Sequence, residues 1–132
     1  MALNVPESHA DLLEASNVAT LTTVGKDGLP QSTAVWFIVD DDGELKSSIT
    51  DVRQKYKNLV AHPKATLLII DPSNPYRTLE IRAEVRLTPD PEKALIRKLA
   101  ARYGMDDPQP LLDLPGERYV VTFDPVRIVT NG

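Results

Sequence analysis

Hydrophobic and polar residues alternate over most of this chain, and the alternation predicts a protein built mainly of β-strands. Six strands are expected, over residues 18–24, 31–39, 44–49, 65–70, 78–88 and 119–129. The fourth of these is almost continuously apolar, which is typical of a strand that is buried on both faces. Glycine-containing turns at 25–28 and 40–43 join the first three strands, so these strands are expected to run antiparallel.

Three short helices are predicted over residues 6–16, 51–61 and 90–104. Asp51 is the expected N-cap of the second helix, and Gly104 is expected to end the third. The apolar face of the second helix would consist of Val52, Tyr56, Leu59 and Val60. The inner face of the third would consist of Leu95, Ile96 and Leu99. Residues 105–117 are expected to form a proline-rich connection without regular structure.

These elements predict a single domain over residues 1–132, mainly β, with short flanking helices. The strands follow one another in hairpin order, and a small antiparallel barrel would leave fewer exposed strand edges than an open sheet. A dinucleotide-binding Rossmann fold is not expected, because no glycine fingerprint follows a strand and strands do not alternate regularly with helices.

Composition narrows the possible functions. The chain has 15 Lys and Arg against 19 Asp and Glu, a net charge of -4, which argues against nucleic-acid binding. It has no cysteine, so disulfides and thiol nucleophiles are excluded. Neither a signal peptide nor an apolar run of about 20 residues is found, so we expect no membrane association and a cytoplasmic location.

No residue pattern indicates a metal site or a catalytic group. His9 and His62 stand apart from any carboxylate cluster. No histidine lies beside Ser47 or Ser48 in the sequence, so nothing local indicates a hydrolase triad. Glu80 and Glu84 share one strand face, which is more typical of a solvated surface than of paired catalytic carboxylates. We therefore predict no metal ligand and name no catalytic residue.

The strongest candidate for a binding site is a concentration of positive charge, made up of Arg53, Lys55, Lys57 and Lys64. It begins directly after a predicted strand that contains Ser48 and Thr50. Basic side chains beside a helix N-terminus can hold a phosphate, with hydroxyl groups as further donors. The same pattern also occurs on ordinary solvated helix faces, and both interpretations remain open at this point.

The order and spacing of several short motifs resemble the pyridoxamine 5'-phosphate oxidase-like split-barrel family. The motifs are 28–33 (GLPQST), 35–37 (VWF), Ser48, 53–59 (RQKYKNL) and 62–65 (HPKA). The resemblance covers roughly residues 11–129 and is greatest to the small actinobacterial branch that uses coenzyme F420, a deazaflavin. It implies a six-stranded antiparallel split barrel and a homodimer with a cofactor in each of two clefts between the subunits. A barrel of this size also leaves an apolar sheet face to be covered.

The resemblance also implies which positions would bind the cofactor. Arg53 and Lys55 would hold its phosphate, assisted by Ser48 and by the backbone near Gln54. Gln31, Thr33 and Val35 would border the tricyclic ring, with Ile49 and Thr50 beneath it. Tyr76 would reach the ring from the other subunit, whereas strand alternation turns Trp36 away toward the core.

The function implied is an F420H2-dependent reductase that transfers a hydride to an electron-poor small molecule. A reduced deazaflavin is itself the hydride donor, which agrees with the lack of a triad or metal cluster in the sequence. FMN is the alternative cofactor, because it carries the same ribityl phosphate. A cofactor-binding module without catalysis is a further alternative.

Overall fold

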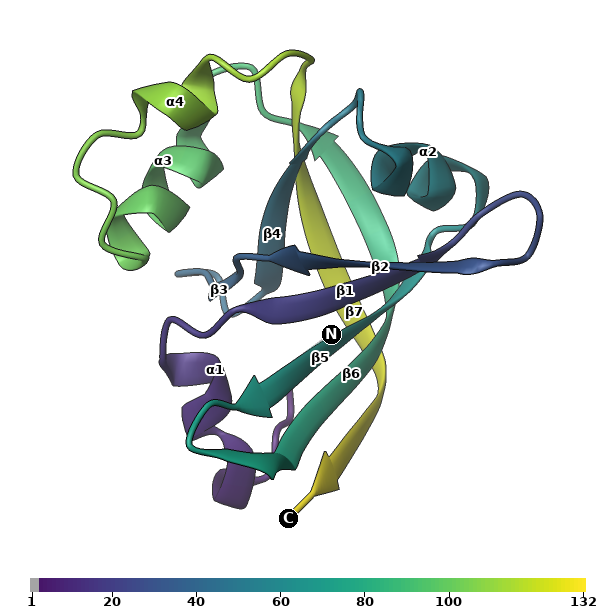
Figure 1. Cartoon of the computed structure of the whole chain (residues 1–132), viewed down its shortest axis with the longest axis vertical. Helices are drawn as coiled ribbons and strands as arrows, with labels where there is room; N and C mark the ends of the chain where they lie inside the picture. The colour runs from purple at the N-terminus through teal and green to yellow at the C-terminus, as the bar shows by residue number, and fades with distance from the viewer. Residues whose placement is uncertain (1–2) are drawn as a thin grey trace.

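The computed structural model describes residues 3–132. Its strands form one antiparallel sheet of seven strands in the order β2-β1-β5-β6-β7-β4-β3, curled into a half-barrel (Figure 1). The strands are β1 (Ala19–Val24), β2 (Pro30–Val35), β3 (Ile38–Val39), β4 (Leu45–Thr50), β5 (Lys64–Asp71), β6 (Asn74–Pro89) and β7 (Arg118–Asn131). The mainly β, antiparallel architecture expected from the sequence is confirmed.

Short helices lie around the sheet. A 3-10 turn, η1 (Glu7–His9), and α1 (Asp11–Glu14) replace the single helix expected at 6–16. The others are α2 (Gln54–Ala61), α3 (Ala94–Arg102) and α4 (Gln109–Leu112). The last lies inside the connection that was expected to be irregular. Figure 1 shows α3 and α4 together at one end of the sheet, near the end of β4 and the beginning of β7.

The seventh strand arises because the segment expected as one strand, 31–39, is interrupted at Trp36 and Phe37. Phe37 is fully buried, and its backbone N–H and C=O bond to the Tyr103 hydroxyl and the Arg102 Nε at 3.1 and 2.9 Å. The Ser47 hydroxyl donates to the Trp36 carbonyl at 2.6 Å. Side chains therefore satisfy the backbone here in place of a neighbouring strand, and the chain can turn between β2 and β3.

The N-cap predicted for α2 is wrong. Arg53 occupies the N-cap position without a side-chain capping bond, while Asp51 pairs with the segment before β7. The Asp51 carboxylate accepts from the Glu117 N–H at 2.9 Å, and its own N–H donates to the Glu117 carbonyl at 3.0 Å. Val52 and Val60 are also exposed, so only Tyr56 and Leu59 of the predicted apolar face lie against the barrel.

The third helix begins at Ala94, later than the start expected at Asp90, because Lys93 before it has a left-handed φ of 55°. The Asp90 carboxylate nevertheless accepts from the N–H groups of Ala94 and Leu95 at 3.1 and 3.0 Å. The helix ends before Gly104, whose φ of +75° lies in the left-handed region that favours glycine.

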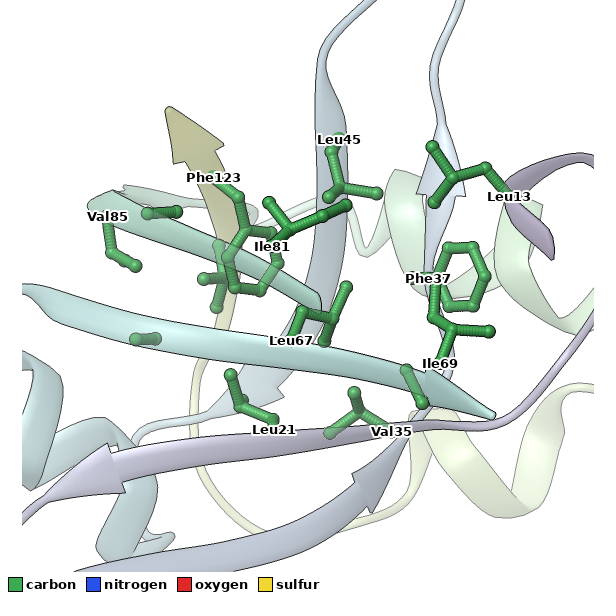
Figure 2. Close-up of a cluster of buried hydrophobic side chains, with 14 of the residues drawn as sticks. Leu13, Leu21, Val35, Phe37, Leu45, Leu67, Ile69, Ile81, Val85 and Phe123 are labelled. Carbon is green, nitrogen blue, oxygen red and sulfur yellow. The ribbon is translucent and has the colours of Figure 1, made fainter. Parts of the chain in front are cut away.

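Two separate groups of apolar side chains hold the fold together. The larger fills the barrel, where Leu21, Leu67, Ile81 and Phe123 point inward from four different strands (Figure 2). The smaller lies beneath α3 and α4 and consists of Leu95, Ile96, Leu99 and Leu112. Trp36 packs against it, stacked on Tyr103 with the ring centroids 4.7 Å apart. The predicted inner face of α3 is thus confirmed. Trp36 packs as expected, but it is not turned away from the candidate site, because its side chain also lines a cleft beside Ser48 and Arg53.

Candidate cofactor site

The candidate site is a cleft of about 300 Å³ where the end of β4, the start of α2 and the first residue of β7 meet. The antiparallel register of β4 and β7 pairs Thr50 with Arg118, which brings Arg118 beside Ser48. The polar side chains of the cleft are Ser48, Arg53, Lys55 and Arg118. Its apolar wall consists of Val18, Ala34, Val35, Trp36, Ile96, Leu99, Leu111 and Leu114.

Three of these polar groups are cations that have no acidic partner. Within residues 3–132, no carboxylate lies within 4 Å of the side-chain nitrogens of Arg53, Lys55 or Arg118. Lys55 donates instead to the Thr33 hydroxyl at 3.2 Å. Arg118 donates to the Leu111 carbonyl at 3.1 Å and makes a long contact of 3.5 Å with the Ser48 hydroxyl. Much of their hydrogen-bonding capacity therefore remains available to a ligand.

The electrostatics of the cleft favour an anion. Burial lowers the pKa of Lys55, and the neighbouring Arg53 and Arg118 lower it further. Burial, followed by the repulsion of Arg53, also lowers the pKa of Arg118. Each shift means that the protonated form is less favourable here than in water. A bound phosphate would offset both the cost of desolvation and the repulsion between the cations, because it would supply negative charge.

The structure brings together only some of the predicted site residues. Val35, Ser48, Arg53 and Lys55 line the cleft, and Thr33 is bonded to Lys55 at its border. Ile49 and Thr50 are buried, with exposed fractions of 1% and 3%. The Ile49 side chain belongs to the barrel core, and neither Ile49 nor Thr50 lines the cleft, so their predicted place beneath the ring is not seen in one chain.

Gln31 and Gln54 lie on a second, larger groove of about 990 Å³ between the β1–β2 turn and α2. Asn58, which is buried, connects them. It donates to Gln31 and to the Thr23 hydroxyl at 3.3 and 3.0 Å, and accepts from Gln54 at 2.8 Å. Lys57 also borders this groove and lines no part of the smaller cleft. Lys26 and Lys57 line the larger groove, but both are exposed, whereas the smaller cleft combines the buried Arg118 and the half-buried Lys55 with Arg53. The smaller cleft is therefore the stronger candidate for a phosphate site.

Tyr76 is far from the cleft within one chain. It is 84% exposed and belongs to the β5–β6 hairpin beside α1, at the opposite end of the sheet (Figure 1). Its predicted contact with the cofactor requires a second subunit and stays a prediction.

Sequence reasoning missed two residues of this region, Arg118 and Asn58. Arg118 stood between a proline-rich segment and an alternating strand, where nothing local distinguished it from a surface arginine. Only the pairing of β4 with β7 brings it to the cleft. Asn58 lies within the predicted helix, four residues after Gln54, and this spacing was a usable signal for an amide pair on one helix face.

Neither a metal-ligand cluster nor a membrane-spanning helix is found in the described residues. In the described part of the chain, no group of three or more His, Cys, Asp or Glu side chains has the arrangement of a metal site. No helix within residues 3–132 is long and apolar enough to cross a membrane.

Comparisons with known proteins identify the family. A solved structure called F420 reductase is similar to this chain at 38% identity, with a TM-score of 0.81, over 95% of this chain and 98% of that one. A conserved hypothetical protein from Mycobacterium tuberculosis is 27% identical, with a TM-score of 0.76, over 98% of this chain and 86% of that one.

The heme storage protein HutZ from Vibrio cholerae shares the fold at 14% identity, with a TM-score of 0.76, over 98% of this chain and 96% of that one. Among curated proteins, none matches the chain. The family model described as pyridoxamine 5'-phosphate oxidase matches residues 5–131, almost the whole length. The chain therefore belongs to the pyridoxamine 5'-phosphate oxidase family.

Proposed function

We propose that this protein is an F420H2-dependent reductase that transfers a hydride to an electron-poor small molecule, such as an unsaturated carbonyl compound or a quinone-like ring. The observation that carries the proposal is the group of three unpaired cations, Arg53, Lys55 and Arg118, beside an apolar cleft. The family and the similar F420 reductase support the coarser statement that it is a flavin- or deazaflavin-type oxidoreductase.

The residues of the cleft fit the chemical groups of such a cofactor. Arg53 and Lys55 would bind the phosphate, and the Ser48 hydroxyl would donate a further hydrogen bond. Val35 and the Thr33 strand would support one edge of the ring, while Ile96 and Leu99 would exclude water from the other side. When bound, the reduced deazaflavin supplies the hydride, and the protein contributes binding and orientation.

FMN is the second candidate cofactor. It shares the ribityl phosphate with coenzyme F420. The chain also belongs to the pyridoxamine 5'-phosphate oxidase family, which supports FMN as an alternative. The cation cluster would hold either phosphate equally well. A non-catalytic cofactor-binding module would use the same cleft, but would not turn over reduced cofactor when an acceptor is added.

We also propose that the working unit is a homodimer. The cleft of one chain, at about 300 Å³, is at the lower end of the range for small-ligand pockets, so a second subunit is expected to complete it. Tyr76 of the second copy would then contribute to the site. Light scattering should give about twice the 14.6 kDa chain mass. A monomer at every concentration would remove the basis for including Tyr76.

The central test is a titration of the purified protein with coenzyme F420 and with FMN, side by side, followed by turnover of each reduced cofactor with a panel of acceptors. The proposal expects tight F420 binding and acceptor-dependent oxidation of F420H2. Stoichiometric FMN binding with undetectable F420 binding would select the second candidate. Binding without turnover of any acceptor would favour the non-catalytic module.

A further inference from the structure

Arg118 contacts both the cleft and the segment that contains α4. It is the first residue of β7 and is only 7% exposed. On one side it contacts Ser48 of β4, beside the other two cations of the cleft. On the other side it donates to the carbonyl of Leu111 in α4 at 3.1 Å. No other hydrogen bond of its side chain is found within residues 3–132, so its remaining N–H groups can serve a ligand.

The segment that contains α4 depends on such contacts. Its apolar residues belong to the smaller core group beneath α3, separate from the core of the barrel. Two cations donate to the carbonyls at the end of α4: Arg118 to that of Leu111, which also accepts a long bond of 3.4 Å from the Leu114 N–H, and Lys93 to that of Leu112 at 2.7 Å. Leu111 and Leu114 form part of the cleft wall. The position of this wall therefore depends partly on Arg118.

We propose that Arg118 is a shared ligand, which binds the cofactor phosphate while keeping its bond to Leu111, so that phosphate and the α4 segment stabilise each other. A guanidinium group suits this role, because its planar set of five N–H groups can serve two acceptors at once. The inference rests on the proposed phosphate site. It adds that filling this site orders the wall of the pocket in which the ring and the substrate would lie.

The coupling has to be reciprocal. If phosphate stabilises the ordered α4 segment through Arg118, then disorder of the segment must lower phosphate affinity by the same factor, and a variant that weakens the segment must lower it by up to that factor. Lys93 offers a matched perturbation, since it holds the same end of α4 from outside the cleft. Lys93→Met is therefore expected to lower cofactor affinity several-fold in the native background and to have no effect in an Arg118→Gln background.

The experiment compares hydrogen exchange of residues 105–117 with and without ligand. The ligands are coenzyme F420 and FMN, each beside its phosphate-free counterpart, the deazariboflavin core and riboflavin. We expect the phosphorylated forms to protect this segment and the phosphate-free forms to protect it much less. Arg118→Gln should abolish the difference and weaken cofactor binding by roughly 10- to 100-fold. Arg118→Lys, which keeps the charge, should recover part of the affinity and little of the protection.

The outcomes separate this inference from the proposed function. If Lys55→Ala abolishes cofactor binding while Arg118→Gln leaves both affinity and protection unchanged, the phosphate site stands and the role of Arg118 is refuted. If the native protein binds phosphorylated and phosphate-free forms equally, the proposed phosphate site and the proposed role of Arg118 are both refuted. Circular dichroism shows whether each variant is folded. If Arg118→Gln does not fold, Arg118→Lys provides the test in its place.

Discussion

Two arginines of this protein illustrate opposite uses of the same side chain. At the end of the sheet beside α1, Arg77 donates to Asp11, to Asp71 and to the Ser8 carbonyl. These hydrogen bonds, that of Asp11 first, raise its pKa. In the cleft, burial and then Arg53 lower the pKa of Arg118. Arg77 thus forms ion pairs with two carboxylates, whereas Arg118 has no carboxylate within 4 Å in the described residues.

The same contrast extends to other cations. Arg86 binds Glu44 and Asp124, and both Lys46 and Lys98 bind Asp40. Exposed lysines such as Lys26 and Lys57 also have no acidic partner within the described residues, but in the cleft the unpaired cations include the buried Arg118 and the half-buried Lys55. Like charges that are partly buried together lower the stability of the empty protein, and such a cost is typical of functional sites. The comparison predicts that the two groups of cations respond in opposite ways to mutation.

The largest effect is expected for Lys55→Ala. Loss of a charge-assisted hydrogen bond to phosphate should weaken cofactor binding by ~1.5–3 kcal/mol, or roughly 10- to 150-fold. Thermal unfolding of the empty protein should show no loss of stability, because the substitution also removes a repelled and partly desolvated charge. Arg53→Ala should behave similarly.

Lys57→Ala is the matched control for this prediction. Lys57 lies on the same helix but is exposed and lines the other groove, so its removal should change affinity much less. Equal effects of the substitutions at Lys55 and Lys57 would mean that the cations form only a solvated face.

The next effect concerns pH. Burial and two neighbouring cations lower the pKa of Lys55 below the ordinary lysine value of 10.5. As pH rises through this lowered pKa, Lys55 loses its charge, and phosphate affinity should fall earlier than for an ordinary lysine. The stability of the empty protein should change in the opposite direction, since the unfolded chain holds this proton more tightly than the folded one.

Titrations of affinity and melting temperature from about pH 8 to pH 10 would test this prediction. Lys55→Arg, whose side chain stays charged, should make the affinity nearly independent of pH in this window. A native protein whose affinity is equally flat would contradict the assignment of Lys55 to the phosphate.

Much of the fold could be predicted from the sequence, because most strands carry their own apolar pattern and the turns between the first three strands contain glycine. The exceptions depend on contacts made at a distance. The interruption at Trp36 and Phe37 requires Ser47, Arg102 and Tyr103, which no local pattern connects to that position. Asp51 looked like a helix cap and is instead used by Glu117.

The site was partly predictable for the same reason. Arg53 and Lys55 follow a strand within a few residues of Ser48, so the local sequence already indicated a group of donors. Arg118 lies 70 residues from Ser48 and reaches it only through strand pairing. The placement of Gln31 and Gln54 on the larger groove likewise depends on how α2 lies against the β1–β2 turn.

A smaller effect, on stability alone, is expected for Arg77→Ala. This substitution removes the bonds that join α1 to the β5–β6 hairpin, so the melting temperature should fall. Cofactor affinity in a protein that stays dimeric should change much less than in the Lys55→Ala variant, because within one chain the cleft lies at the other end of the sheet and only the neighbouring Tyr76 is proposed to reach the cleft of the second copy. Arg82→Ala is a suitable control, since Arg82 is more exposed and bonds only to Glu80 on its own strand. Loss of cofactor binding by the folded Arg77 variant would break the division between the two groups of cations.

The smallest effect is expected at Asp40, where a hydrogen bond from Lys98 is the largest cause of a pKa lowered to about 2. A carboxyl group whose pKa is lower in the folded protein stabilises it above its unfolded pKa, and this stability is lost as pH falls toward the folded value. The contribution should therefore be complete above about pH 5 and disappear between about pH 4 and pH 2. Because the Lys98 side chain is 43% exposed and solvent screens the pair, we expect less than about 1 kcal/mol. Asp40→Asn should lower the free energy of unfolding at pH 7 by this amount and leave it nearly unchanged at pH 2, whereas Asp41→Asn, at a fully exposed position, should change neither. An Asp40 variant as stable as the native protein at pH 7 and in low salt would show that even the matched cations of this protein contribute nothing measurable.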